Sequence, residues 1–248
     1  MATEPRTDRA RTVMRLLWRS RIQHAPRRGP QARISVDDIV EAGIDAADRG
    51  GIEDVKMRDI AQALGTKVMT LYTHVPEKDM LLELMIDAVA ARFQLSIPPG
   101  ASVEQALRTV LDANYRFLLR HSWLMDIHSE QPPLGPGSLG KYEQELGALE
   151  PFGIADETMD AVLTFLQNFA RAAAGDSVRR QAAATSNVDW WGTMGPLLSQ
   201  YLEDGEYPLA ARVGAAAGAS LGGAYNADAA YEFGEQLIVD AACALIRR

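Results

Sequence analysis

The sequence has few of the residues and patterns that disulfide-rich, membrane-spanning and sheet-based proteins need. Its 248 residues include one cysteine, Cys243, which excludes a disulfide within one chain and suits a reducing compartment. No apolar run approaches the roughly 20 residues of a transmembrane helix, and no signal-peptide pattern is present. Alternation of Val or Ile with polar residues is almost absent. We therefore expect an all-α protein that is soluble and cytoplasmic.

Charge is distributed unevenly along the chain. The formal net charge is -8, but residues 1–33 hold nine Arg and a net charge of +7. Residues 34–78 carry a net charge of -4, and residues 79–248 carry -11. A basic end on an acidic body is typical of a protein that contacts DNA with that end. The acidic body should keep DNA away from its other faces.

The most informative stretch is 59–78, which predicts two short helices with a break between them. An apolar stripe at helical spacing marks the first helix: Met57, Ile60, Ala61 and Leu64. Gly65 should end that helix, since glycine adopts the left-handed backbone conformation at little cost. In the second helix Leu71 and Val75 share the inward face, and Pro76 closes it. This pattern predicts a helix-turn-helix unit, although a small solvated helix pair in an all-α core is an equal alternative on spacing alone.

The outward face of the second helix then offers groups that suit base edges. With Leu71 and Val75 inside, four residues point away: Met69, Thr70, Thr73 and His74. A Thr hydroxyl can hydrogen-bond to a base and a methyl group can pack on thymine. Val68 is ambiguous, and Thr66 is the candidate N-cap, because the Lys67 side chain has no oxygen to accept the first N–H groups.

These residues resemble a known family. The segment LGTKVMTLYTHVPEKDMLLEL resembles the helix-turn-helix signature of TetR-family bacterial repressors, and AGIDAADRGG upstream continues the match. YEFGEQLI near the C-terminus resembles a segment of the tetracycline-repressor branch. The resemblance implies an all-α protein with an N-terminal three-helix helix-turn-helix DNA-binding domain and a C-terminal helical ligand-binding and dimerisation domain. We divide the chain into a flexible Arg-rich arm (1–33), a DNA-binding domain (34–79) and a ligand-binding and dimerisation domain (80–248).

The resemblance also implies that Tyr72 and Lys78 hold DNA phosphates. In the arm, Pro26 and Pro30 disfavour helix, and an extended Arg-rich segment suits the minor groove. The alternative for the arm is a disordered tail that aids solubility. The DNA-contact residues expected are Arg27, Arg28, Arg33, Thr66, Lys67, Val68, Met69, Thr70, Tyr72, Thr73, His74 and Lys78.

Further helices are expected along the rest of the chain. They span 35–49, 77–93, 103–120, 139–149, 157–180, 190–202 and 229–246, with a turn or two of helix within 13–22, a short helix at 121–128, and mostly loop over 205–228. Ser35 and Asp38 predict a capping box for the first helix of the DNA-binding domain. The resemblance implies that helices 157–180 and 229–246 form a four-helix dimer interface, the alternative being an intramolecular core.

A ligand pocket is expected where aromatic, Met and isolated polar residues interrupt apolar helices. The candidates are Gln94, Asn114, Tyr115, Trp123, Met125, His128, Gln167, Phe169, Trp190 and Trp191. For each one alone, an ordinary core position is the more common explanation. The resemblance places His128 where tetracycline repressors hold a drug-bound magnesium, but Gln94, Val110 and Asn114 differ from the drug contacts at matching positions. We therefore expect neither tetracycline nor a metal, and no cofactor.

Together these observations predict a homodimeric DNA-binding regulator. We expect a repressor that leaves a palindromic operator when a small, largely apolar molecule binds its C-terminal domain. One alternative is a regulator without a small-molecule ligand. A remote alternative is a helical enzyme with a metal site formed by His121, Asp126, His128 and Glu130. These residues do not match the His-Glu-x-x-His pattern, and their spacing fits no single helical face.

Overall fold

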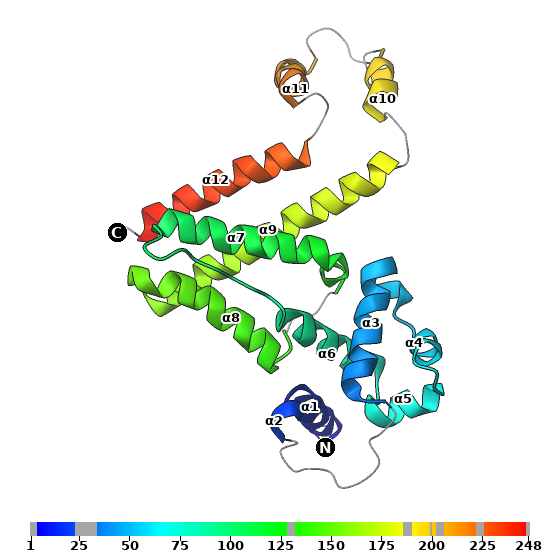
Figure 1. The fold of residues 1–248 in the computed structure, drawn as a ribbon. Helices are drawn as coiled ribbons and strands as arrows, with labels where there is room; N and C mark the ends of the chain where they lie inside the picture. The colour runs from blue at the N-terminus through cyan, green and yellow to red at the C-terminus, as the bar shows by residue number, and fades with distance from the viewer. Residues whose placement is uncertain are drawn as a thin grey trace.

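The computed structural model describes residues 4–22, 34–127, 132–185, 190–198, 200–201, 206–221 and 226–246. All regular structure in these ranges is helical, which confirms the all-α prediction (Figure 1). The α-helices are α1 (Glu4–Leu17), α2 (Arg19–Ile22), α3 (Val36–Gly50), α4 (Met57–Ala63), α5 (Val68–His74), α6 (Lys78–Ala90), α7 (Val103–Arg120), α8 (Pro136–Leu149), α9 (Asp156–Thr185), α10 (Trp190–Leu198), α11 (Pro208–Leu221) and α12 (Ala227–Ile246). Short 3-10 turns span Ile52–Asp54, Ser122–Met125 and Glu150–Phe152.

Helices α3, α4 and α5 form a compact N-terminal unit. The predicted capping box starts α3: the Ser35 hydroxyl accepts from the backbone N–H of Asp38, and the Asp38 carboxylate accepts from that of Ser35. The Asp38 pKa is lowered by the hydrogen bonds that its carboxylate accepts from Ser35, first from the backbone N–H and then from the hydroxyl. Ile39 and Ile44 on α3 are buried with apolar residues of α4, α5 and α6 in one continuous core.

Helix α6 connects this unit to the rest of the molecule. It packs on α3 on one side and on α8 on the other (Figure 1). On α6, the buried Asp87 carboxylate accepts a 2.8 Å hydrogen bond from the backbone N–H of Ser138, in the first turn of α8. A carboxylate at this place also meets the positive end of the α8 helix dipole. The connection between the two parts is therefore both apolar and hydrogen-bonded.

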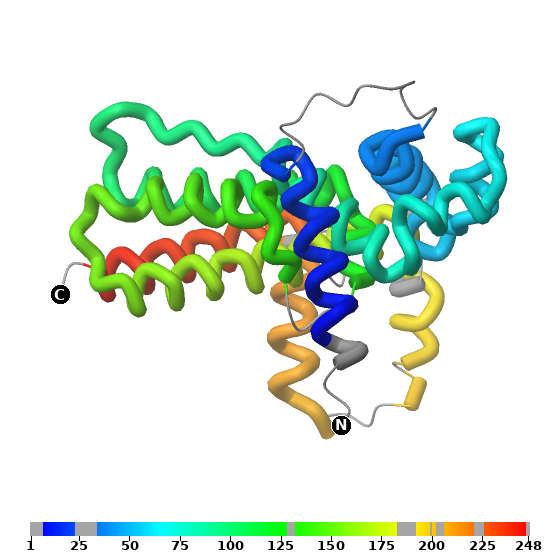
Figure 2. The backbone as a smooth tube through the Cα atoms, turned by 90° about the horizontal axis from the view of Figure 1, so that it is seen from below, coloured from blue at the N-terminus to red at the C-terminus, as the bar shows by residue number. Residues whose placement is uncertain are grey.

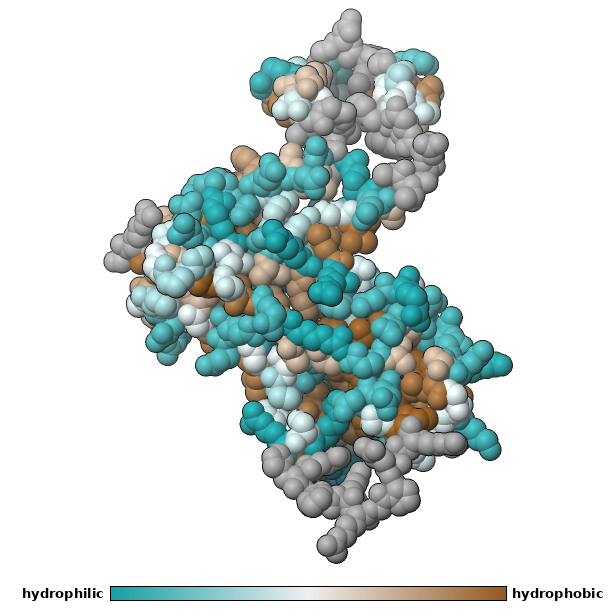
Figure 3. All heavy atoms as spheres, in the orientation of Figure 1, coloured by the Kyte–Doolittle hydropathy of each residue, from teal (hydrophilic) through white to brown (hydrophobic). Residues whose placement is uncertain are grey.

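Helices α7, α8, α9 and α12 form the C-terminal body. Helix α7 spans the predicted residues 103–120 and begins with a capping box between Ser102 and Gln105. It packs along α9, and α12 lies against both (Figures 1 and 2). Figure 3 shows a mainly hydrophilic outer face with smaller apolar patches between the polar residues.

The N-terminal segment differs from the flexible arm predicted for 1–33. Residues 4–22 form α1 and α2, and α1 packs on α6. Val13 and Leu17, four residues apart on one face of α1, are buried in the main core. Nine arginines suggested a solvated arm, but the apolar face between them supplies enough buried surface to hold a helix. Residues 23–33 lie outside the described part.

Three other boundaries differ from the sequence prediction. Helix α8 begins at Pro136, because proline suits the first turn of a helix. Helix α10 ends at Leu198, four residues earlier than predicted. The region predicted as mostly loop contains α11, whose Ala-rich sequence favours helix despite its glycines. Helices α10 and α11 extend beyond the body and expose large apolar side chains (Figure 1).

Replacing Gly137 by Ala should destabilise the protein by about 1–3 kcal/mol, because a methyl group there would lie 1.9 Å from the backbone oxygen of Asp87. Gly140→Ala is the matched control on the same helix, since a methyl group at Gly140 meets no described atom within 4 Å. This second change should stabilise by about 0.5–1 kcal/mol through helix propensity. Urea unfolding of both variants measures the difference. Equal stability would contradict the close contact of α6 with α8.

Candidate DNA interface and effector site

The break between α4 and α5 has the geometry of a glycine-terminated helix. Gly65 has a φ of 62°, in the left-handed region, as predicted. The backbone N–H of Thr66 reaches back to the carbonyl of Ala61 at 2.9 Å and satisfies it. This turn lets α5 leave at an angle to α4, which is the arrangement of a helix-turn-helix unit.

Helix α5 has one buried face and one exposed face. Leu71 and Val75 are completely buried, as the spacing predicted, while the Met69 side chain is 73% exposed. The N-cap is Lys67 and not Thr66, and in the described part no side-chain hydrogen bond caps this helix. The first N–H groups of α5 thus remain available to an outside acceptor.

The other residues predicted to contact DNA lie on or beside this exposed face. Tyr72 and Thr73 are exposed, and Thr66, Val68, Thr70 and His74 are half-buried. The Thr73 hydroxyl donates a 2.6 Å hydrogen bond to the carbonyl of Thr70, which leaves its methyl group and oxygen lone pairs for other partners. Arg27, Arg28 and Arg33 lie outside the described residues.

Lys78 is exposed at the first position of α6. The preceding residue, Glu77, is the N-cap, but no side-chain cap hydrogen bond of Glu77 is found in the described part. Its carboxylate instead accepts from the Arg9 guanidinium at 3.1 Å. Lys78 and the first N–H groups of α6 therefore present positive charge together.

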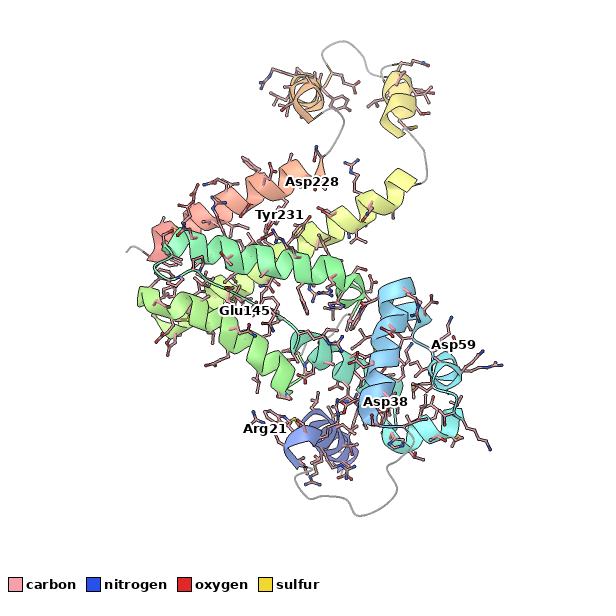
Figure 4. The ribbon with its side chains drawn as sticks, in the orientation of Figure 1. Arg21, Asp38, Asp59, Glu145, Asp228 and Tyr231 are labelled. Atoms are coloured by element: carbon pink, nitrogen blue, oxygen red, sulfur yellow. The ribbon has the colours of Figure 1, made fainter. Side chains whose placement is uncertain are left out.

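Two of the predicted ligand residues belong to a buried polar network between α7, α8 and α9. At its centre lies Glu145, completely buried on α8 (Figure 4). Its carboxylate accepts from the Asn114 amide at 2.6 Å, from Lys141 at 2.6 Å and from Gln167 at 2.9 Å. Burial lowers the pKa of Lys141, and the charge of Glu145 opposes that shift. The Lys141 ammonium also lies 4.6 Å from the centre of the Phe93 ring.

Two more predicted residues belong to an aromatic stack between α7, α9 and α12. The Tyr231 ring is stacked on Tyr115, with 4.1 Å between the ring centres, and Phe169 lies nearly parallel at 6.0 Å (Figure 4). Tyr115 shares a 2.8 Å hydrogen bond with Ser177, whereas the buried hydroxyl of Tyr231 has no partner among the described residues. Burial, then the charges of Glu235 and Asp112, raise the pKa of Tyr231.

Gly234 explains how the stack can form. A methyl group at this position on α12 would lie 2.4 Å from the Phe169 ring. The glycine therefore allows α12 to approach α9 closely enough for the rings to overlap.

Trp123, another predicted ligand residue, instead lies at the contact between the two parts of the molecule. Its buried indole N–H donates to the Asp48 carboxylate of α3 at 2.6 Å. His121 Nδ1 lies 2.9 Å from the same oxygen. Arg171 of α9 donates to the backbone carbonyl of the next residue, Leu124, at 2.9 Å. This turn therefore ties α9 to the first helix of the DNA-binding unit.

The remaining candidates are not brought together by the structure. Gln94 is exposed on the loop after α6, and Met125 is half-buried against the core. His128 lies outside the described residues, as do the side chains of Trp190 and Trp191 in α10. Within the described ranges, no three His, Cys, Asp or Glu side chains come close enough to hold a metal ion. The same ranges hold no helix of the length and hydropathy needed to span a membrane.

Several residues of these clusters were missed by sequence reasoning. Lys141 and Glu145 are four residues apart on α8, a spacing that ordinarily indicates a surface ion pair. Asp48, Asp87 and Tyr231 have no neighbouring motif in the sequence. For Asp87, the signal in the sequence is the Gly-x-Gly segment of residues 135–137, which favours a close helix contact.

Comparison with known proteins identifies related chains. Residues 98–242 match the family described as "Tetracyclin repressor-like, C-terminal domain". The transcriptional repressor DrrR1 of Streptomyces coeruleorubidus is 32% identical over 212 residues, which cover 82% of this chain and 76% of DrrR1. The tetracycline repressor class E of Escherichia coli is 28% identical over 61% of this chain and 71% of its own length. The crystal structure of the Streptomyces coelicolor TetR family protein ActR in complex with actinorhodin matches with a TM-score of 0.68, 26% identity, and coverage of 88% of this chain and all of ActR.

Replacing Glu145 by Gln should destabilise the protein by about 3 kcal/mol, because it removes the negative charge that balances the Lys141 ammonium in a buried place. Glu143→Gln, at an exposed position of the same helix, should change stability by less than about 0.5 kcal/mol. The double change Glu145→Leu with Lys141→Met, which removes both buried charges together, should recover most of the loss. Urea unfolding measures all three variants. An unchanged free energy of unfolding in Glu145→Gln would show that water, and not the network, surrounds this carboxylate.

Proposed function

The chain belongs to the TetR family of transcriptional regulators, and from this premise we propose that it is a homodimeric repressor released from a palindromic operator by a small, largely apolar molecule. DNA binds at the α4–α5 unit, and the effector binds in the body formed by α7, α8, α9 and α12. The regulator acts in the cytoplasm and uses no metal or cofactor.

The observation that carries this proposal is the two-sided character of α5. Its apolar side is fully used by the core, and its exposed side carries Met69, Tyr72 and Thr73. These side chains take no part in the described core, but they could contact base edges and phosphates in a major groove. Lys78 and the start of α6 supply a phosphate contact beside it.

A dimer is supported by the outer faces of α9 and α12. Large apolar side chains are exposed there: Phe165, Phe233, Leu237 and Leu245. Apolar side chains of this size gather on one surface when a partner covers them. A second copy would cover them by two-fold symmetry and would give two reading helices, as a palindromic operator requires.

The interior of the body supports a small-molecule effector. The stack of Tyr115, Tyr231 and Phe169 offers flat apolar surfaces, and the Tyr231 hydroxyl offers a donor. ActR, the similar protein, was crystallised with actinorhodin. The contact of Trp123 with Asp48 provides a route from the body to α3. A shift of tens- to thousands-fold in operator affinity needs only about 2–4 kcal/mol of differential effector affinity between two states.

Changes on α5 and at the start of α6 should affect DNA binding differently. Thr70→Ala with Thr73→Ala should relax sequence preference, because these residues face the bases. Lys78→Ala should weaken binding to all sequences alike and lower the salt dependence by about one charge per subunit. Duplexes selected from a random library by the wild-type protein, titrated at several salt concentrations, measure both effects. An equal loss of preference in the two variants would contradict the assigned roles.

The dimer can be tested on the exposed face of α12. Phe233→Glu with Leu237→Glu should give a monomer at micromolar concentration and reduce operator affinity at least about 100-fold, since one half-site contributes too few contacts. Leu139→Glu, at another exposed apolar position on α8, is the control and should leave a dimer. Sedimentation measures the mass of each variant. A wild-type monomer that protects a single half-site would rule the dimer out.

A further inference from the structure

Helices α1 and α2 lie across the joint between the two parts of the molecule. Figure 2 shows α1 between the body of α7, α8, α9 and α12 on one side and the α3–α5 unit on the other. We refer to residues 4–22, which contain α1 and α2, as the N-terminal strap. It makes apolar contacts with the connecting helix and polar contacts with both parts.

The apolar contacts hold the strap on α6. Val13 and Leu17 are buried, and Leu16 and Trp18 pack against the same core. Burying two such side chains contributes about 1.5–3 kcal/mol each relative to exposure. The strap is therefore a docked element and not a solvated tail.

Its contacts with the DNA-binding side use two arginines. Arg9 donates to Glu77 at 3.1 Å and to Glu83 at 2.9 Å, which joins the turn before α6 to the middle of α6. Arg19 donates through Nε to Asp37, in the first turn of α3, at 3.0 Å. The strap thus neutralises three carboxylates close to the end of the molecule that would meet DNA.

Among the described residues, its contact with the body includes a directed hydrogen bond. The Trp18 indole N–H donates to the backbone carbonyl of Leu134 at 2.9 Å. Leu134 lies just before α8, whose first turn is bound to Asp87 of α6. The same strap therefore contacts α3, α6 and the segment that leads into α8.

We propose that the N-terminal strap fixes the DNA-binding unit relative to the effector body in the orientation that binds the operator. The proposal rests on the repressor function above and adds an element that holds its DNA-binding state. When the strap is docked, Glu77, Glu83 and Asp37 are paired with arginines. When it leaves, these three carboxylates lose their arginine partners, and Glu77 among them directly precedes Lys78, so the added negative charge would repel DNA phosphates.

The strap also offers a path for the effector signal. A displacement of the segment that carries Leu134 breaks the bond to Trp18 and weakens docking of the strap. Loss of docking frees the DNA-binding unit and exposes the carboxylates together. Effector binding and loss of the strap then both lower operator affinity.

Two substitutions separate this role from a simple effect of charge. Arg9→Ala removes both ion pairs between the strap and α6 with its N-cap. Arg11→Ala makes the same charge change on the same helix, but the Arg11 side chain is 75% exposed and pairs with Asp8 of its own helix. A third variant, Trp18→Phe, removes the bond to Leu134 and changes no charge. All three variants keep Val13 and Leu17, so the helix can still fold.

Two measurements are made on each variant. Hydrogen exchange monitored by mass spectrometry reports protection of α1 and of the first turns of α3 and α6, with α9 as an internal reference. Binding to a duplex selected from a random library by the wild-type protein gives the operator affinity. We expect Arg9→Ala and Trp18→Phe to speed exchange in α1 and to weaken binding about three- to tenfold, and Arg11→Ala to change binding by less than about twofold.

An equal loss of affinity in Arg9→Ala and Arg11→Ala would overturn the proposal in favour of a general charge effect. Unchanged affinity in Trp18→Phe with faster exchange in α1 would overturn the link between docking and DNA binding. Tighter operator binding by Arg9→Ala, the opposite of the expected change, would also overturn the proposal. If the wild-type protein selects no duplex, the repressor function fails, and exchange in Arg9→Ala against Arg11→Ala still decides whether the strap bridges the joint.

Discussion

The contact between Asp87 and the first turn of α8 determines how the two parts of this protein are joined. A buried carboxylate is costly unless it is paired, and here the backbone N–H of Ser138 and the helix dipole pair it. Gly137 makes this approach possible, because a side chain there would overlap the backbone of α6. Helix α6 also begins at Lys78, beside the reading helix. One helix therefore connects the proposed phosphate contact at Lys78 to the body.

The body buries charged and polar side chains at positions between helices where apolar residues are usual. Glu145 receives three donors, and burial lowers the pKa of Lys141 while the Glu145 carboxylate opposes that shift. Such a pair adds little net stability, since the loss of hydration offsets the attraction. It does fix how α7, α8 and α9 meet, because other alignments would leave a buried charge unpaired. In the proposed repressor, alternation between two states would then involve only a small number of packings.

Local signals made the DNA-binding unit predictable, and long-range contacts limited the prediction elsewhere. Gly65, the Ser35 capping box and the inward pair Leu71 and Val75 each act within a few residues, and all are found as expected. The helical turns expected within 13–22 are found, but the docking of the strap on α6 was not predicted, because the arginines around Val13 and Leu17 suggested a solvated arm and their partners lie far along the chain. Trp123 was predicted as a ligand contact, but it bonds to Asp48, 75 residues earlier. The expected roles of Asn114, Tyr115, Gln167 and Phe169 in effector binding stay predictions, although the structure groups them in two clusters.

The position of the strap in the chain has a consequence for folding. Its hydrogen-bond partners Glu77, Glu83 and Leu134 follow it by 68, 74 and 116 residues. The strap is synthesised first but has no docking surface until α6 and the start of α8 exist and have folded. Contacts of this range close late, since chain entropy opposes them until the surrounding structure has formed. On a ribosome that adds about 5–20 residues per second, the strap would wait several seconds for its partners, with its apolar face open to chaperones.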